Sequence, residues 1–229
     1  MGNNGMTGSV TNTAVSRRGI LLALAVAICA LASPGIAPAE PLRIVALGDS
    51  LTAGLGLAQK EAFPVRLEAA LRAKGHDVEV INAGVSGDTA SGGLARLDWS
   101  VPAKTDAVIL ELGANDALRA TDPAATRKAL DETLRRLKER KVEILLAGMQ
   151  APPNMGADYI AAFNRIYPEL AQKHGVLLYP FFLDGVAAVE KLNQRDGIHP
   201  TAAGIDAIVE RILPSVEKLI AQTRANRKD

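Results

Sequence analysis

From residue 42 onward, short and mostly apolar runs alternate with longer segments that carry an apolar stripe. The short runs have the length of strands, and we expect strands over 44–47, 78–81, 107–112, 142–147 and 176–178. A strand that is apolar on both faces has to be covered on both faces, which is typical of a parallel sheet between two layers of helices. The alternation therefore predicts an α/β fold with a parallel sheet at its centre.

The longer segments have the periodicity of amphipathic helices. We expect helices over 62–74, 92–98, 123–140, 159–174 and 202–221. In the last of them, apolar residues recur at helical spacing from Ile205 to Leu219, and Pro214 should kink or split the helix. Right-handed crossovers between parallel strands would bring the loops that follow the strands to one edge of the sheet. We therefore look for chemistry in the loops 48–56, 82–93 and 113–122.

The first 39 residues differ from the rest of the chain. Arg17 and Arg18 precede an apolar run from Ile20 to Ala32, and Ala37-Pro38-Ala39 places small residues at both positions that a signal peptidase reads. This order is typical of a secretory signal, and the apolar run is short for a membrane span. We therefore expect cleavage after Ala39. Twin-arginine export and a retained N-terminal anchor are the alternatives.

Cleavage would leave a single domain over 40–229 and a secreted, periplasmic protein without a membrane anchor. It would also remove Cys29, the only cysteine of the chain, which excludes disulfides, a cysteine nucleophile and a cysteine-based zinc site. The net charge is +1, with no long run of one sign, and this argues against nucleic acid as a partner.

Ser50 stands directly after the first predicted strand, in the stretch Gly48-Asp49-Ser50-Leu51. The region beyond the carboxyl ends of parallel strands is where many α/β enzymes place their chemistry. Gly48 permits a sharp turn and a close approach of the backbone. Taken alone, however, a serine after a strand is more simply the N-cap of a helix.

A serine nucleophile needs a base and a carboxylate that orients the base. The chain has three histidines, of which His76 and His174 adjoin glycines at helix ends and are expected to be surface or capping residues. His199 differs, because Pro200 makes it extended and Gly197 lets the chain bend, so that Asp196 can fold back onto the imidazole. The alternative is that Asp196 only forms a turn.

A serine that attacks a carbonyl group also needs hydrogen-bond donors for the oxyanion that forms. Three candidates lie in the loops that should converge: the Ser50 N–H, the Gly87 N–H and the side-chain amide of Asn115. Each residue also has an ordinary explanation, since Gly and Asn favour turns. Asp49 and Asp116, in the same loops, we interpret as scaffold that binds loop backbone.

Four segments together resemble the conserved blocks of the GDSL, or SGNH, hydrolase family. They are Gly48–Leu51, Ser86–Thr89, Gly113–Asp116 and Asp196–Pro200, and the resemblance runs in order across 42–220. It implies a flavodoxin-like three-layer α/β/α sandwich with sheet order 2-1-3-4-5. It also implies Ser50 as nucleophile, His199 as base, Asp196 as its partner, and oxyanion donors from Ser50, Gly87 and Asn115. No metal or organic cofactor is implied.

Within that family, Gly93–Leu97 and Tyr179–Phe182 resemble the secreted bacterial branch called arylesterase, thioesterase I or lysophospholipase. The resemblance implies hydrolysis of small-molecule esters and thioesters through an acyl-enzyme on Ser50: aryl esters, short to medium acyl esters, lysophospholipids and acyl thioesters. We expect the protein to be a monomer. Apolar residues near the expected mouth form either an acyl groove or packing under loops; they are Leu55, Leu57, Ala117, Leu118, Met149, Ala151, Pro152, Pro153 and Met155.

Two other functions remain as alternatives. The first is a carbohydrate deacetylase of the same family, which the aromatic content of 3% disfavours because sugar rings stack on aromatic side chains. The second is a non-catalytic flavodoxin-like binding domain or flavin carrier that uses 82–89 as a phosphate loop. The pair of Asp196 and His199 argues against it, because a binding domain does not need that pair.

Overall fold

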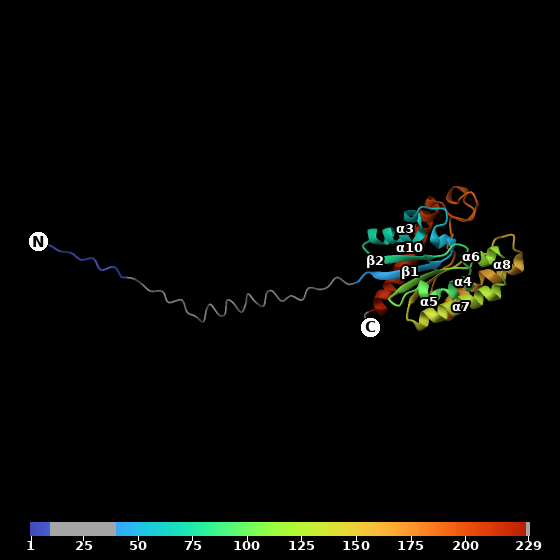
Figure 1. The fold of residues 1–229 in the computed structure, drawn as a ribbon, viewed down its shortest axis with the longest axis horizontal. Coiled ribbons are helices and arrows are strands. Elements are labelled where there is room, and N and C mark those ends of the chain that lie inside the picture. The colour runs from blue at the N-terminus through green and yellow to red at the C-terminus, as the bar shows by residue number, and fades with distance from the viewer. Residues whose placement is uncertain (10–39, 228–229) are drawn as a thin grey trace. The chain divides into compact units, whose positions relative to one another are not determined.

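The structure is a computed structural model that describes residues 1–9 and 40–227. The chain divides into two units, Met1–Glu40 and Pro41–Asp229, and every helix and strand of the described residues belongs to the second (Figure 1). Residues 10–39 of the predicted signal sequence, with Arg17, Arg18 and Cys29, lie outside the described residues. Across the ranges 1–9 and 40–227, no helix combines the length and apolar character that crossing a membrane requires.

Five parallel strands form one sheet in the order β2-β1-β3-β4-β5, as predicted (Figure 1). The strands are β1 (Leu42–Gly48), β2 (Val78–Gly84), β3 (Ala107–Glu111), β4 (Glu143–Ala147) and β5 (Leu177–Tyr179). The register pairs Gly48 with both Gly84 and Glu111, so the first three strands end at the same level. The loops that follow them therefore start from one edge of the sheet, which is where the sequence places the chemistry.

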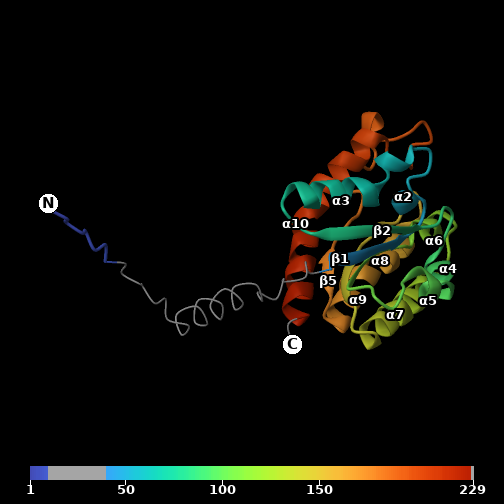
Figure 2. The same cartoon turned by 60° about the vertical axis from the view of Figure 1, so that its left-hand side comes forward.

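Helices cover both faces of the sheet and complete the three-layer sandwich. Figure 2 shows α3 and α10 on one face, and α4, α5, α7, α8 and α9 on the other. The helices are α2 (Ser50–Ala53), α3 (Phe63–Ala73), α4 (Ala90–Ala95), α5 (Leu97–Ser100), α6 (Ala114–Leu118), α7 (Pro123–Glu139), α8 (Ala157–Asn164), α9 (Ile166–His174) and α10 (Ala202–Asn226), with 3₁₀ turns η1 (Gln59–Glu61) and η2 (Glu190–Leu192).

The central strands are buried on both faces, and this explains their continuous apolar sequence. Every residue of β3 is buried, and so is every residue of β1 except Arg43. Aromatic side chains pack in pairs within the core: Phe63 packs edge-on against Phe182 at a centroid distance of 5.0 Å, and Phe163 against Tyr167 at 5.9 Å. The aliphatic residues of strands and helices supply the rest of the core.

Two prolines inside predicted helices have different effects. One helix was expected over 159–174, but it is broken at Arg165 into α8 and α9. Pro168 accounts for the break, because its ring lacks an N–H and clashes with the carbonyl of residue 164. Pro214, which was expected to kink or split its helix, lies inside the uninterrupted helix α10, so it does not split the helix. Buried Ile212 and Val216 hold both sides of Pro214 against the core.

Candidate active site

The end of β1 shapes the turn that presents Ser50. Asp49, and not Ser50, is the N-cap of α2: its carboxylate accepts the Leu51 N–H at 2.9 Å. The simplest alternative role for Ser50, helix capping, therefore belongs to its neighbour, and the serine hydroxyl is free for other contacts. Gly48 is required here, because a Cβ at that position would lie 2.1 Å from the Thr52 hydroxyl oxygen.

Ser50, His199 and Asp196 form one hydrogen-bonded chain. The His199 Nε2 lies 2.9 Å from the Ser50 Oγ, and the His199 Nδ1 lies 2.7 Å from an Asp196 carboxylate oxygen. Because a carboxylate only accepts hydrogen bonds, Nδ1 carries the ring proton, and Nε2 accepts from the serine hydroxyl. The other Asp196 oxygen accepts the backbone N–H groups of Ile198 and His199. The His199 hydrogen bond, followed by these backbone hydrogen bonds, lowers the pKa of Asp196 to about 2.

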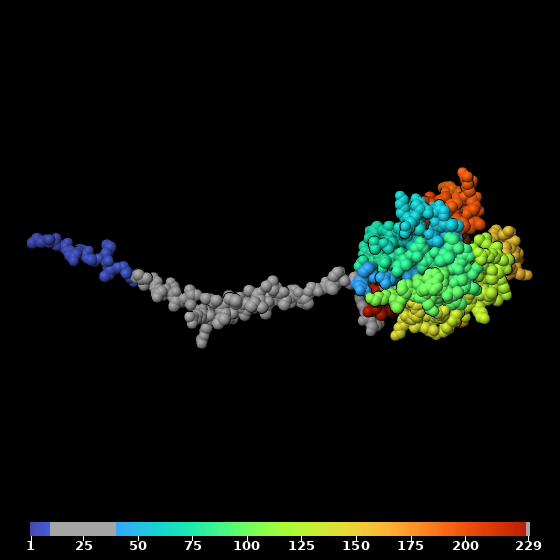
Figure 3. Space-filling view, viewed as in Figure 1, coloured from blue at the N-terminus to red at the C-terminus, as the bar shows by residue number. Residues whose placement is uncertain are grey.

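Gln194 forms hydrogen bonds between the loop that carries His199 and the loop that follows Ser50 and α2. Its backbone N–H donates to the His199 carbonyl at 2.7 Å, and its side-chain amide donates to the carbonyls of Leu55 and Pro200. Figure 3 shows the orange segment before α10 standing beside the cyan segment after α2. The motifs gave no signal for Gln194, because its partners lie 139 and 6 residues away along the chain.

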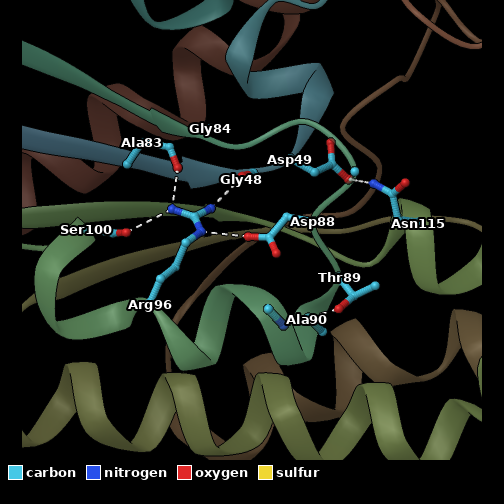
Figure 4. Close-up of polar contacts among 12 residues, drawn as sticks. Gly48, Asp49, Ala83, Gly84, Asp88, Thr89, Ala90, Arg96, Ser100 and Asn115 are labelled. Atoms are coloured by element: carbon cyan, nitrogen blue, oxygen red, sulfur yellow. Dashed lines mark hydrogen bonds and ion pairs between the residues drawn. The ribbon is translucent and has the colours of Figure 1, made fainter.

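The three predicted oxyanion donors follow the ends of β1, β2 and β3: Ser50 begins α2, Gly87 lies in the loop after β2, and Asn115 lies in α6. Asn115 is the second residue of α6, and its amide donates one hydrogen to the Asp49 carboxylate at 3.1 Å (Figure 4). The backbone N–H groups of Ser50 and Gly87 donate to no acceptor in the part of the chain that the structure describes. Gly87 has φ of +82°, and its carbonyl accepts a hydrogen bond from Arg119, which follows α6.

Two further contacts agree with the scaffold role expected of the aspartates. Asp116 accepts the Ala90 N–H at 2.8 Å and the Thr126 hydroxyl at 3.0 Å, so it joins α6 to α4 and α7. His76 and His174 lie away from this site, where each contacts a carboxylate, Glu217 and Asp131 respectively.

An apolar cleft of about 410 Å³ opens beside the serine. Ser50, Asn115 and His199 line it, whereas Gly87 does not. Six of the nine apolar residues expected at the mouth also line it: Ala117, Leu118, Met149, Ala151, Pro152 and Pro153. Leu55, Leu57 and Met155 do not. Further lining residues, which the sequence motifs did not predict, come from the loop between β5 and α10: Phe181, Leu183, Ala187, Ala188 and Ile198.

A buried acidic pair lies behind the nucleophile. Glu111 is fully buried; one carboxyl oxygen accepts the Thr52 hydroxyl at 2.7 Å and the Asp49 N–H at 3.4 Å. The other oxygen has no hydrogen-bond partner among the described residues. Burial, and then the nearby charge of Asp49, raise the pKa of Glu111 well above its ordinary value. Burial also raises the pKa of Asp49 to about 6, against hydrogen bonds from Leu51 and Asn115.

The raised pKa of Glu111 makes a prediction about stability. The folded protein holds this proton more tightly than the unfolded chain, so the stabilising contribution is complete below pH 4.5 and is lost as the pH rises toward the folded pKa. Glu111→Gln is neutral at every pH and keeps the acceptor for Thr52. We expect its unfolding free energy to gain on wild type by about 1.4 kcal/mol per pH unit above 4.5, until the folded pKa is reached.

Urea unfolding of both proteins at several values between pH 4.5 and 8 measures this difference. An infrared band of a protonated carboxyl at pH 7, present in wild type and absent in Glu111→Gln, would confirm the assignment independently. Stability curves that run parallel over the whole pH range would show that Glu111 is ionised in the folded protein.

Comparisons with known proteins identify the family. Residues 46–207 match the model of the GDSL-like lipase/acylhydrolase family. The esterase TesA of Pseudomonas aeruginosa is 40% identical over 185 residues, which cover 80% of this chain and 91% of the relative. The thioesterase 1/protease 1/lysophospholipase L1 of Escherichia coli K12 is 36% identical over 178 residues, 77% of this chain and 84% of the relative.

Solved structures agree with these sequence relatives. AlinE4, an SGNH-hydrolase family esterase, superposes with a TM-score of 0.68 at 46% identity, and the match covers 80% of this chain and 98% of AlinE4. The predicted resemblance is therefore confirmed over nearly the whole of the second unit. On the match to the family model and on these relatives, the chain belongs to the GDSL-like lipase/acylhydrolase family.

Proposed function

We propose that this protein is a secreted serine esterase that hydrolyses carboxylic esters and thioesters through an acyl-enzyme on Ser50. The observation that carries the proposal is the hydrogen-bonded chain from Asp196 through His199 to Ser50, which ends in an apolar cleft. Membership of the family, together with relatives named esterase and thioesterase/lysophospholipase, identifies ester hydrolysis as the class of reaction.

The geometry supports acylation by general-base catalysis. His199 Nε2 takes the Ser50 proton as Oγ attacks the carbonyl carbon, and the imidazolium that forms is stabilised by the Asp196 carboxylate 2.7 Å away. The low pKa of Asp196, about 2, keeps this partner ionised throughout the physiological range. The same imidazolium then protonates the leaving alcohol or thiol, and a water activated by His199 releases the acid in a second step.

The oxyanion of each tetrahedral intermediate requires donors that are already in place. The amide of Asn115 has two hydrogens, and Asp49 accepts one of them, which holds the side chain so that the other is left for the substrate. The backbone N–H groups of Ser50 and Gly87 supply the second and third donors. A scaffold aspartate thus fixes the direction of a catalytic amide.

The cleft supports an acyl-binding role. Its lining is dominated by aliphatic and small side chains, which suits the hydrocarbon chain of a short to medium acyl group. Aryl esters, lysophospholipids and acyl thioesters are therefore the proposed substrates. Phe181 is the only aromatic residue that lines the cleft among the residues described, which gives a sugar ring little to stack on.

The same proposal covers the rest of the chain. Residues 1–39 act as a cleaved signal peptide, and 40–229 form the single hydrolase domain of a monomeric periplasmic or extracellular protein that binds no nucleic acid. The order of arginines, apolar run and small residues supports export. The start of the sheet at Leu42, three residues beyond the proposed cleavage point, supports the boundary.

Labelling by a fluorophosphonate tests the proposed function. We expect the protein lacking residues 1–39 to hydrolyse p-nitrophenyl butyrate, to lose that activity on labelling, and to carry the added mass on Ser50. Esters of graded chain length, with an acetylated oligosaccharide beside them, then define the substrate class. A folded protein that gains no mass at Ser50 would refute the mechanism, and rapid turnover of only the sugar ester would favour a deacetylase.

Asn115→Ala tests the oxyanion assignment. Loss of one donor to the oxyanion should lower kcat by roughly 10² to 10³-fold with little change in KM, because the hydrogen bond strengthens only as negative charge develops. Steady-state kinetics on p-nitrophenyl butyrate measure the effect, and circular dichroism checks the fold. A kcat within threefold of wild type would exclude Asn115 from the oxyanion site.

A further inference from the structure

A buried arginine joins the two loops that supply backbone donors to the proposed site. Arg96 lies between α4 and α5, and only 7% of it is exposed. Burial of a guanidinium is energetically costly unless its N–H groups are hydrogen-bonded and its positive charge is paired with a negative one. Figure 4 shows the guanidinium surrounded by the ends of two strands and by the loop after β2.

Four hydrogen bonds hold the guanidinium in place. Nε donates to the Asp88 carboxylate at 2.6 Å, and Nη2 donates to the Gly48 carbonyl at 2.8 Å. Nη1 donates to the Ala83 carbonyl at 2.8 Å and to the Ser100 hydroxyl at 2.9 Å. Asp88 is itself largely buried, with 12% of its side chain exposed, so the pair is shielded from water and salt. The planar fork therefore contacts β1, β2, α5 and the loop after β2 at once.

The places of these contacts matter for the reaction. Gly48 stands two residues before Ser50, and its carbonyl also accepts the Val85 N–H at 3.0 Å. Asp88 directly follows Gly87, the other proposed backbone donor. The Arg96 side chain therefore binds both the Gly48 carbonyl, two residues before Ser50, and the Asp88 carboxylate, next to Gly87.

We propose that Arg96 is a positioning residue that sets the distance between the Ser50 N–H and the Gly87 N–H, so that both groups can donate hydrogen bonds to the same oxyanion. The inference rests on the proposed function, and it identifies the side chain that holds the two backbone donors of the oxyanion site in place. Arg96 does not contact the substrate, and it acts through Gly48 and Asp88. A rigid fork is needed for this task, because an ammonium group offers a single point of attachment on a flexible stem.

Replacing Arg96 should weaken stabilisation of the transition state and leave substrate binding nearly unchanged. Displacement of a donor by about 1 Å costs on the order of 10²-fold in rate, whereas binding of the uncharged ester depends on the apolar cleft. We therefore expect Arg96→Lys to lower kcat by about 10²-fold while KM stays within about threefold. Asp88→Asn leaves the Gly48, Ala83 and Ser100 acceptors in place and removes the negative charge that pairs with Arg96, and it should lower kcat by a smaller factor.

An alkylboronic acid separates positioning from general stabilisation. It forms a tetrahedral, anionic adduct on the serine and resembles the transition state, whereas the carboxylic acid product resembles the ground state. We expect Arg96→Lys to weaken inhibition by the boronic acid by the same factor as kcat, and to leave inhibition by the product unchanged. Assays run well below the melting temperature of each variant, and Arg135→Lys, on the exposed surface of α7, serves as the matched control.

Every outcome bears on the proposal. A parallel loss of kcat and boronic acid affinity supports it, and slower labelling of Ser50 by the fluorophosphonate supports it further. A folded Arg96→Lys with the kcat of the control, or with a loss confined to KM, overturns it. If Arg96→Lys does not fold, Asp88→Asn decides by the same criteria. Failure of the proposed function is recognised separately, because wild type itself would then gain no mass at Ser50.

Discussion

Replacing Ser50 with alanine is expected to lower kcat for p-nitrophenyl butyrate by about 10⁵ to 10⁶-fold. The substitution removes Oγ, so no acyl-enzyme can form and His199 Nε2 has no hydroxyl to deprotonate. The residual rate over water would come from the oxyanion donors and from binding in the cleft. The fold should be retained, because the removed atom contributes only the hydrogen bond to His199.

The measurement is a kcat from protein that carries no wild-type contamination, checked by the absence of fluorophosphonate labelling. Ser91→Ala, on the exposed surface of α4, is the matched control and should retain wild-type activity. A Ser50→Ala protein with more than a hundredth of the wild-type kcat would mean that another group attacks the ester, and the acyl-enzyme mechanism would be wrong.

Asp196→Asn is expected to lower kcat by about 10³ to 10⁴-fold through the tautomer of His199. The backbone N–H groups of Ile198 and His199 occupy one carboxylate oxygen, so the amide oxygen of the variant must take that position. Its NH₂ group then faces His199 Nδ1 and, being a donor, requires Nδ1 to be unprotonated. The ring proton moves to Nε2, which can no longer accept the Ser50 proton.

Kinetics with active-site titration distinguish this loss from a loss of folded protein. Asp184→Asn removes a carboxylate from a surface ion pair with Arg211 in the same part of the chain, and it should leave kcat unchanged. The KM of Asp196→Asn should also stay near that of wild type, since the cleft is untouched. A kcat within tenfold of wild type would show that the exposed Asp196 does not govern the tautomer.

The sheet could be predicted because strands that are buried on both faces consist of consecutive apolar residues, and such a run is visible in the sequence. Each residue of β3 is buried, and the corresponding run is apolar except for Glu111. Prolines show the limit of such local rules. The rule that proline breaks a helix explains the end of α8 before Pro168, yet α10 continues through Pro214 because the flanking residues pack into the core.

The triad and the oxyanion candidates were also within reach of the sequence. Ser50 and His199 are 149 positions apart. Ser50 directly follows β1, and His199 lies in the loop between β5 and α10. Their motifs still predicted the contact, because the loops that follow parallel strands meet at one edge of the sheet. Gln194 and the wall formed by the loop after β5 had no such signal. Their contacts depend on how an irregular loop packs, and irregular loops have no periodicity to read.

The sequence by itself determined which chemical groups follow the strands. From these groups the family, the fold and the contacts from Asp196 through His199 to Ser50 could be predicted. Only the tertiary structure decided the state of those groups. Whether Glu111 holds a proton depends on its complete burial beside Asp49. Whether Arg96 can bridge two loops depends on the carbonyls of Gly48 and Ala83, which lie on two different strands, β1 and β2. Burial and hydrogen-bond partners are set by residues distant in the chain, so no local pattern encodes them.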